Sequence, residues 1–126
     1  MPQLNAIGIV VSDMAASIRF YRAVGLDVPE TPGEGHVDAF LPNGVRFMLD
    51  SEEVMRSFLP EWRRTNGNQV GLALECSSPA EVDEAHARVV EAGFASVKEP
   101  FDAFWGQRYA IVRDPDGVDV SLYAAR

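Results

Sequence analysis

Residues 105–123 read Trp105-Gly-Gln-Arg-Tyr-Ala-Ile-Val-Arg-Asp-Pro-Asp-Gly-Val-Asp-Val-Ser-Leu-Tyr123. Apolar and polar residues alternate up to Val112 and again from Val118, which is the period of a strand with one buried face. Between the two runs, Asp116-Gly117 favours a tight turn, because Gly takes a positive φ without a Cβ clash and Asp tolerates it. This stretch therefore predicts a β-hairpin.

The same pattern occurs earlier, so the chain contains an internal repeat. Pro42-Asn-Gly-Val-Arg-Phe-Met-Leu-Asp50 recurs 73 positions later as Pro115-Asp-Gly-Val-Asp-Val-Ser-Leu-Tyr123. Gly8-Ile-Val-Val is echoed 63 positions later by Gly71-Leu-Ala-Leu, and each precedes a predicted helix. We therefore predict one α+β domain over 1–126, made of two tandem βαβββ units with curved mixed sheets around a cleft and helices outside. Unit one covers 1–50, a connector 51–67, and unit two 68–126.

Capping signals place three helices. Asp13 is a good N-cap for a helix over 14–24 that stops at Gly25. Ser78-Pro-Ala-Glu81 is a capping box that starts a second helix, which ends at Gly93. Ser51 starts a short helix in the connector that Pro60 ends. The Pro- and Gly-rich residues 29–35 predict a loose strand followed by a flexible loop.

Composition narrows the function classes. The chain has 126 residues, 47% hydrophobic and 24% charged, and a formal net charge of −8. An acidic chain without a basic stripe repels phosphate backbones, so we expect no nucleic-acid partner. No apolar run is long enough to span a membrane, and the first residues do not resemble a signal peptide. A single cysteine, Cys76, suits a reducing compartment, so we expect a cytoplasmic protein.

Strand parity sorts the side chains into two faces. One face carries the apolar residues that must pack on helices. The other carries small residues, large aromatics and a few polar groups, as a small-molecule pocket requires. This second face is equally consistent with a second core or a dimer interface. The candidate ligand-binding residues are Trp105, Tyr109, Gln107, His36, Asp38, Phe40, Met48, Asp50, Trp62 and Ser121. Trp62 lies in a polar connector and is either a surface cover or a lid.

The doubled βαβββ unit and two motifs resemble the vicinal oxygen chelate superfamily, which includes glyoxalase I, extradiol dioxygenases and bleomycin-resistance proteins. The motifs are Val-Val-Ser-Asp-Met-x-x-Ser-x-x-Phe-Tyr-Arg at 10–22 and Arg-Asp-Pro-Asp-Gly at 113–117. The resemblance covers essentially the whole chain. It implies four strand positions that hold a divalent metal in the enzymes, and these are Ala6, Met48, Gln69 and Ser121 here.

These four residues are poor ligands for a hard or borderline divalent ion, which prefers imidazole or carboxylate. The chain has two histidines. We predict that His86 lies on the surface of its helix. His36 and Asp38 are expected to be rim or hydrogen-bonding groups, because two residues on one strand do not make a four-point cage. We therefore expect no metal, no cofactor and no catalytic residue.

Residues 104–117 look most similar to the corresponding segment of the mitomycin-resistance protein and, more distantly, of the bleomycin-resistance proteins. The resemblance implies a homodimer that binds and sequesters an antibiotic, conferring self-resistance. The expected ligand is a small planar aromatic, such as a quinone-type antibiotic, a bleomycin-type compound or a flavin-like molecule. Trp105 is the expected stacking residue. Two alternatives remain: a lyase, isomerase, dioxygenase or biosynthetic enzyme of the same superfamily, and a purely structural dimerisation module.

Overall fold

The computed structural model describes residues 1–31, 33, 35–65 and 70–126. The chain divides into two compact units, Met1–Thr65 and Asn66–Arg126. Each unit is described by itself. Within the described residues, no helix combines the length and the apolar character that crossing a membrane requires.

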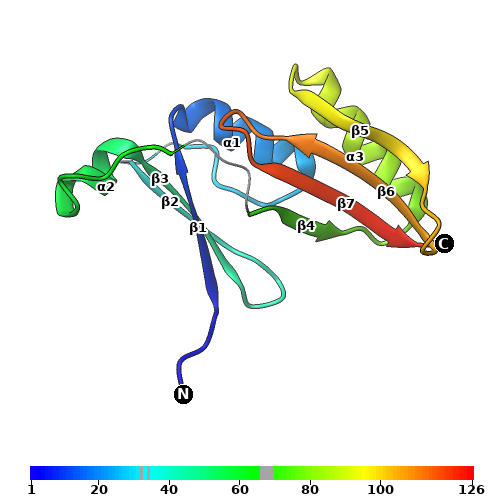
Figure 1. Cartoon of the computed structure of the whole chain (residues 1–126), viewed down its shortest axis with the longest axis horizontal. Coiled ribbons are helices and arrows are strands. Elements are labelled where there is room, and N and C mark those ends of the chain that lie inside the picture. The colour runs from blue at the N-terminus through cyan, green and yellow to red at the C-terminus, as the bar shows by residue number, and fades with distance from the viewer. Residues whose placement is uncertain (32, 34, 66–69) are drawn as a thin grey trace. The chain divides into compact units, whose positions relative to one another are not determined.

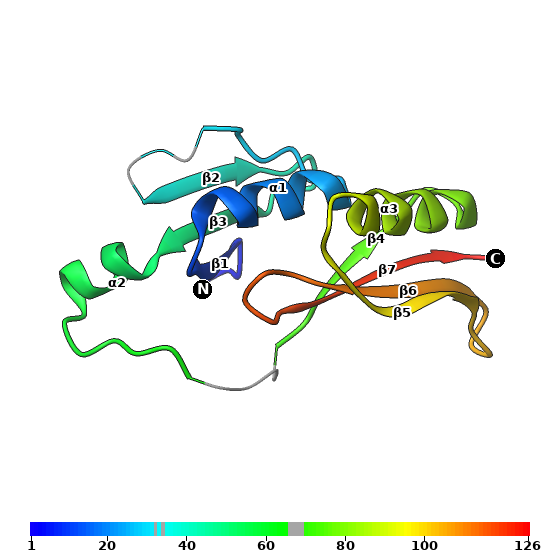
Figure 2. The ribbon, with the colours of Figure 1, turned by 90° about the horizontal axis from the view of Figure 1, so that it is seen from above.

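The first unit is a three-stranded mixed sheet with two helices. It contains β1 (Ala6–Val11), α1 (Met14–Val24), β2 (His36–Phe40), β3 (Arg46–Ser51) and α2 (Glu52–Phe58). The strand order is β1-β3-β2, with β1 parallel and β2 antiparallel to β3. Figure 2 shows α1 lying beside β2 and β3.

Local signals set the ends of α1, as the sequence predicts. The Asp13 carboxylate accepts the backbone N–H of Ala16 at 3.0 Å, and Gly25 ends the helix at a φ of 116°. The apolar stripe of α1 packs on the sheet, where the rings of Tyr21 and Phe47 meet edge to face at 4.9 Å. Phe47 and Leu49 of β3 are buried, as strand parity predicts.

The loose strand expected around residues 29–35 is wrong for the described part of that segment, which forms no strand. Pro29 has no N–H to give to a sheet. The carbonyl of Val28 instead accepts a hydrogen bond from Arg22 Nη1 at 2.5 Å, so the helix side chain takes the place of a neighbouring strand. The first unit therefore has the order βαββ followed by α2, and not βαβββ.

The connector helix α2 agrees with its sequence signals. Ser51 Oγ accepts the backbone N–H of Val54 at 3.1 Å, which makes it the N-cap. The helix ends at Phe58, two residues before Pro60, which cannot donate to a helical carbonyl.

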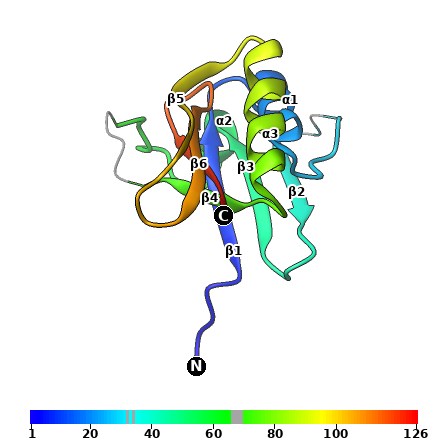
Figure 3. The same ribbon diagram turned by 90° about the vertical axis from the view of Figure 1, so that its right-hand side faces the viewer.

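The second unit has the predicted βαβββ order. It contains β4 (Leu72–Glu75), α3 (Pro79–Glu91), β5 (Ala95–Asp102), β6 (Gln107–Arg113) and β7 (Asp119–Ala125). The strand order is β4-β7-β6-β5, with β4 parallel to β7 and the other neighbours antiparallel. Helix α3 covers one face of this sheet (Figures 1 and 3). Its buried residues Val82, Ala85 and Val89 pack against the buried residues of β6 and β7.

The Arg-Asp-Pro-Asp-Gly motif forms the β6–β7 turn. Asp114 is 4% exposed, and its Oδ1 accepts the backbone N–H groups of Asp116 at 2.9 Å and Val118 at 2.8 Å. Gly117 has a φ of 90°, the conformation that an L side chain resists. Asp114 thus supplies the acceptors that a turn backbone lacks.

The expected surface position of His86 is wrong. The residue is 9% exposed, and its Nε2 lies 2.7 Å from the hydroxyl of Ser96 on β5. His86 follows Val82 by four residues, so it shares the buried stripe of α3. A helical stripe wide enough to face a sheet includes this position.

Candidate functional site

The face of the first sheet that lies opposite α1 combines four charged or titratable side chains with five apolar residues. The pairing register arranges nine residues on it in three rows: Ala6–Arg46–Phe40, Gly8–Met48–Asp38 and Val10–Asp50–His36. The β1 column holds small side chains, whereas β2 and β3 supply charged and large ones. All the residues predicted for the site from this unit, except Trp62, therefore share one face.

His36 is held between two carboxylates on this face. Its Nδ1 lies 2.5 Å from Asp50 Oδ1, and its Nε2 lies 3.0 Å from Asp38 Oδ2. The hydrogen bond to Asp50, and then that to Asp38, raises the pKa of His36 above its ordinary value. The imidazolium form donates both N–H groups, so the cluster favours the protonated ring.

Asp38 also faces Arg46 on β3. Arg46 Nη1 lies 3.8 Å from Asp38 Oδ1, an oxygen that is buried and makes no hydrogen bond within the described residues. Opposite charges adjoin one another from Arg46 through Asp38 and His36 to Asp50, across the three rows. The four groups together are neutral when His36 is protonated and singly negative when it is not.

The corresponding face of the second sheet is aromatic. Trp105 stands at the tip of the β5–β6 hairpin, 50% exposed. Three rings meet its ring edge to face, with centroid distances of 4.9 Å to Phe104, 5.4 Å to Tyr109 and 6.2 Å to Phe101. We call these four residues the aromatic cluster. Phe104 is 95% exposed, so the cluster presents ring surface to its surroundings.

Polar groups lie directly beside the aromatic cluster. Trp105 Nε1 donates to Gln107 Oε1 at 2.8 Å, and the Tyr109 hydroxyl is hydrogen-bonded to Ser121 Oγ at 2.8 Å. Ser121 lies on β7 opposite Ile111, so the Tyr109 side chain reaches it diagonally across the strand pair. The structure thus brings together Trp105, Gln107, Tyr109 and Ser121, all four of which the sequence predicts for the site.

Trp62 lies in the connector of the first unit, and arginines surround its ring. The guanidinium carbons of Arg56 and Arg64 lie 5.5 and 5.8 Å from the ring centroid. Both arginines also pair with Glu52, at 3.2 and 2.6 Å. Trp62 therefore ties the connector to α2, and its predicted ligand-binding role stays a prediction.

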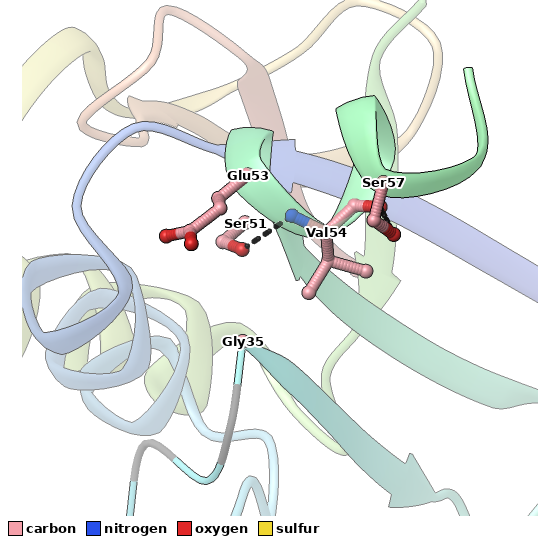
Figure 4. A pocket seen from close by; sticks show the side chains of 5 residues that line it. All are labelled: Gly35, Ser51, Glu53, Val54 and Ser57. Atoms are coloured by element: carbon pink, nitrogen blue, oxygen red, sulfur yellow. Dashed lines mark hydrogen bonds between the residues drawn. The ribbon is translucent and has the colours of Figure 1, made fainter. Parts of the chain in front are cut away.

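A pocket of about 340 Å³ opens beside α2, lined by Gly35, Ser51, Glu53, Val54 and Ser57 (Figure 4). Its two hydroxyls serve the helix itself. Ser51 Oγ caps α2, and Ser57 Oγ donates to the carbonyl of Val54 at 2.6 Å. None of the predicted site residues lines this pocket, so we do not assign it the ligand.

Comparison with known proteins assigns this fold to a superfamily. Residues 3–122 match the model of the Glyoxalase/Bleomycin resistance protein/Dioxygenase superfamily. The chain belongs to this superfamily. It is the family that the sequence motifs predict, which is also called the vicinal oxygen chelate superfamily. None of the curated proteins matches the chain.

Solved structures with similar folds come from several bacteria. The hypothetical protein SA1046 from S. aureus is 26% identical, with a TM-score of 0.81 over 99% of this chain and 95% of that one. Protein ATC0852 from Agrobacterium tumefaciens is 27% identical, with a TM-score of 0.75 over 100% and 99%. A glyoxalase/bleomycin resistance protein/dioxygenase family enzyme from Burkholderia phytofirmans PsJN is 18% identical, with a TM-score of 0.84 over 99% and 100%, which supports the fold alone.

The metal positions that the superfamily implies do not fit a divalent ion among the described residues. Ala6 offers no donor, Met48 offers a soft thioether, and the Ser121 hydroxyl is engaged by Tyr109. Gln69, the fourth position, lies outside the described residues. Elsewhere in the described part of the chain, no group of three His, Cys, Asp or Glu is arranged as a metal site. We therefore derive no chemistry through a metal.

Four residues beside the predicted ones were missed from the sequence. Phe101 and Phe104 complete the aromatic cluster, Tyr123 pairs with Tyr109 across β6 and β7, and Arg46 faces Asp38. Phe104 adjoins Trp105, and Tyr123 shares the parity of Ser121, so both could have been found. Phe101 could not, because irregular pairing between β5 and β6 sets its register.

Proposed function

We propose that the protein binds and sequesters a planar aromatic small molecule, such as an antibiotic, without using a metal. The observation that carries the proposal is the half-exposed Trp105 within four rings of one sheet face, with hydrogen-bonding groups beside it. Superfamily membership is compatible with it, because bleomycin-resistance proteins belong to the same superfamily. In this proposal the protein acts as a cytoplasmic homodimer that confers self-resistance.

Physical magnitudes support binding by contact alone. Each aromatic contact contributes roughly 0.5–1.5 kcal/mol beyond area burial. Burying about 300 Å² of apolar ligand surface contributes on the order of 7 kcal/mol before ordering costs. Together these values correspond to about micromolar affinity after part of the gain is lost to ordering. The ligand then needs no covalent or metal chemistry to be held.

Tryptophan fluorescence tests this proposal. The purified protein is titrated with quinone antibiotics, bleomycin-type glycopeptides and flavins, and we expect at least one class to quench its emission. Trp105→Ala should weaken binding of that class at least about tenfold, because it removes the central ring. Trp62→Phe removes the other tryptophan of the chain, so it shows which of the two rings is quenched and measures the contribution of Trp62 to affinity separately. Absence of binding in all three classes would contradict the proposal, as would equal affinity of the Trp105→Ala variant.

An enzyme of the same superfamily is the second candidate, and the His36 cluster favours it. An imidazole oriented by Asp50 and paired with Asp38 is a group that can take or give a proton. Elemental analysis of protein purified without chelator separates the two functions. A stoichiometric divalent ion would favour the enzyme over the binding protein, as would turnover of a substrate that is lost in His36→Asn.

A further inference from the structure

The direction of one hydrogen bond fixes the chemistry that Gln107 presents. The indole Nε1 of Trp105 can only donate, so the group 2.8 Å away must be the Gln107 carbonyl oxygen. This places the amide nitrogen, Nε2, on the other side of the Gln107 amide. Nε2 makes no hydrogen bond within the described part of the chain and is left as a donor beside the aromatic cluster.

The hydroxyl pair on the same face presents a second donor. Tyr109 and Ser121 each carry one O–H, and the bond between them uses one of the two. Either hydroxyl can be the donor in this bond, so the O–H of the other one remains. The cross-strand neighbours of Ser121 are Ile111 and Ala73, whose apolar side chains do not compete for that O–H.

The carboxylates of Glu75 and Asp119 lie further from the cluster on this face. Glu75 is in the same row as Tyr109 but two strands away, on β4 beyond Tyr123. Asp119 pairs with Arg113 at 2.8 Å. At the opposite edge, Lys98 Nζ lies 4.9 Å from the Phe101 ring centroid and adds a third donor. The surroundings of the aromatic cluster are therefore rich in donors.

We infer that the ligand of the aromatic cluster is a planar ring system that carries carbonyl oxygens, which accept from Gln107 Nε2 and from the remaining O–H of the Tyr109–Ser121 pair. This inference rests on the proposed function and narrows its ligand class. Rings whose edges carry only N–H or O–H donors are disfavoured, because the donors of the site would be left unpaired on desolvation. Gln107 and the Tyr109–Ser121 hydroxyl pair determine specificity. The rings supply the part of the affinity that does not depend on the polar groups of the ligand.

The experiment compares anthraquinone-2-sulfonate with anthracene-2-sulfonate by isothermal titration calorimetry. The two probes share their shape and charge and differ in the two ring carbonyls. We expect the anthraquinone to bind about tenfold more tightly, the value of about one well-formed hydrogen bond. Carbonyls also withdraw electrons from the rings and change stacking, so the variants below decide the assignment.

Gln107→Glu keeps an oxygen for the Trp105 N–H and replaces the amide donor with an acceptor. It should abolish the preference for the quinone, and the double change Tyr109→Phe with Ser121→Ala, which removes both hydroxyls, should reduce it several-fold. Tyr109→Phe is the matched control, since it leaves the Ser121 hydroxyl free and should preserve the preference. Thermal unfolding of each variant checks that the sheet is intact.

The outcomes of these experiments separate the carbonyl inference from the proposed function on which it rests. Equal affinity for both probes, with binding lost in Trp105→Ala, overturns the carbonyl inference and leaves the proposed function standing. An unchanged preference in both Gln107→Glu and the Tyr109→Phe/Ser121→Ala double variant overturns the assignment of the carbonyl-binding donors. Absence of binding by either probe, in a protein that also fails the panel of antibiotics and flavins, overturns both.

Discussion

The two units repeat one sequence pattern, yet their exposed sheet faces differ in kind. The first unit presents a charged row in which His36 lies between Asp38 and Asp50. The second presents four packed rings with donor groups beside them. The buried faces, by contrast, are alike, with Phe47 and Leu49 matching Val120 and Leu122. Duplication preserves the side that must pack on a helix and leaves the other side free to diverge.

The turns of the two hairpins show the same division. Leu41 and Asp114 make equivalent backbone bonds, donating to Val45 and Val118 at 3.0 and 2.9 Å. Only the second turn has a buried carboxylate that accepts two further N–H groups. In the first turn Asn43, an exposed residue, accepts the N–H of Val45 at 3.1 Å.

The largest expected effect on the free energy of unfolding comes from this difference between the acceptors of the two turns. Asp114→Ala leaves two backbone N–H groups without their charged acceptor, so it should lower the free energy of unfolding by roughly 3 kcal/mol. Asn43→Ala, the matched change in the first unit, should cost less than about 1 kcal/mol, because water replaces an exposed acceptor. Urea unfolding of both variants measures the two values. Equal costs would show that burial of Asp114 is not what distinguishes the turns.

A smaller effect on stability is expected when one arginine of each sheet is replaced. Arg108 forms two hydrogen bonds with Asp83 of α3, at 2.9 and 3.2 Å, and a third with Asp102 of β5 at 3.2 Å. Arg46 has a looser partner, with its Nη1 3.8 Å from Asp38. Arg108→Met should therefore lower the free energy of unfolding more than Arg46→Met, which should change it little. Thermal unfolding at low and high salt checks this, since the Arg108 contribution should shrink as salt rises.

The smallest effect is the pH dependence that His36 contributes to the stability of the first unit. The folded pKa of His36 is raised above its value in the unfolded chain, so its pairing with Asp50 and Asp38 stabilises the fold fully below about pH 6.5. That stabilisation is lost as pH rises through the folded pKa. The stability difference between the wild type and His36→Asn should thus be larger at about pH 5.5 than at about pH 9.

An NMR titration locates the group responsible for that pH dependence. Asp50→Asn should lower the pKa of His36 in the folded protein, because it removes the largest cause of the shift. An unchanged His36 titration in Asp50→Asn would show that the hydrogen bond does not govern it. A pH dependence retained in full by His36→Asn would assign the effect to another residue.

The sequence by itself determined the features that depend on local chemistry. Capping residues such as Asp13 and Ser51 fixed helix ends, and alternation fixed the buried faces of β3 and β7, because both act through neighbours within a few residues. The repeat and the motif at 113–117 then predicted the superfamily. Trp105, Gln107, Tyr109 and Ser121 were placed on one face by parity alone.

Tertiary structure decided which side chains meet and in which direction they bond. The Tyr109–Ser121 contact, the enclosure of His36 and the burial of His86 against Ser96 depend on strand register and on packing between distant segments. In the described residues after α1, the carbonyl of Val28 accepts from the Arg22 side chain and not from a strand. Such pairings depend on which groups folding brings together, and no local periodicity encodes them.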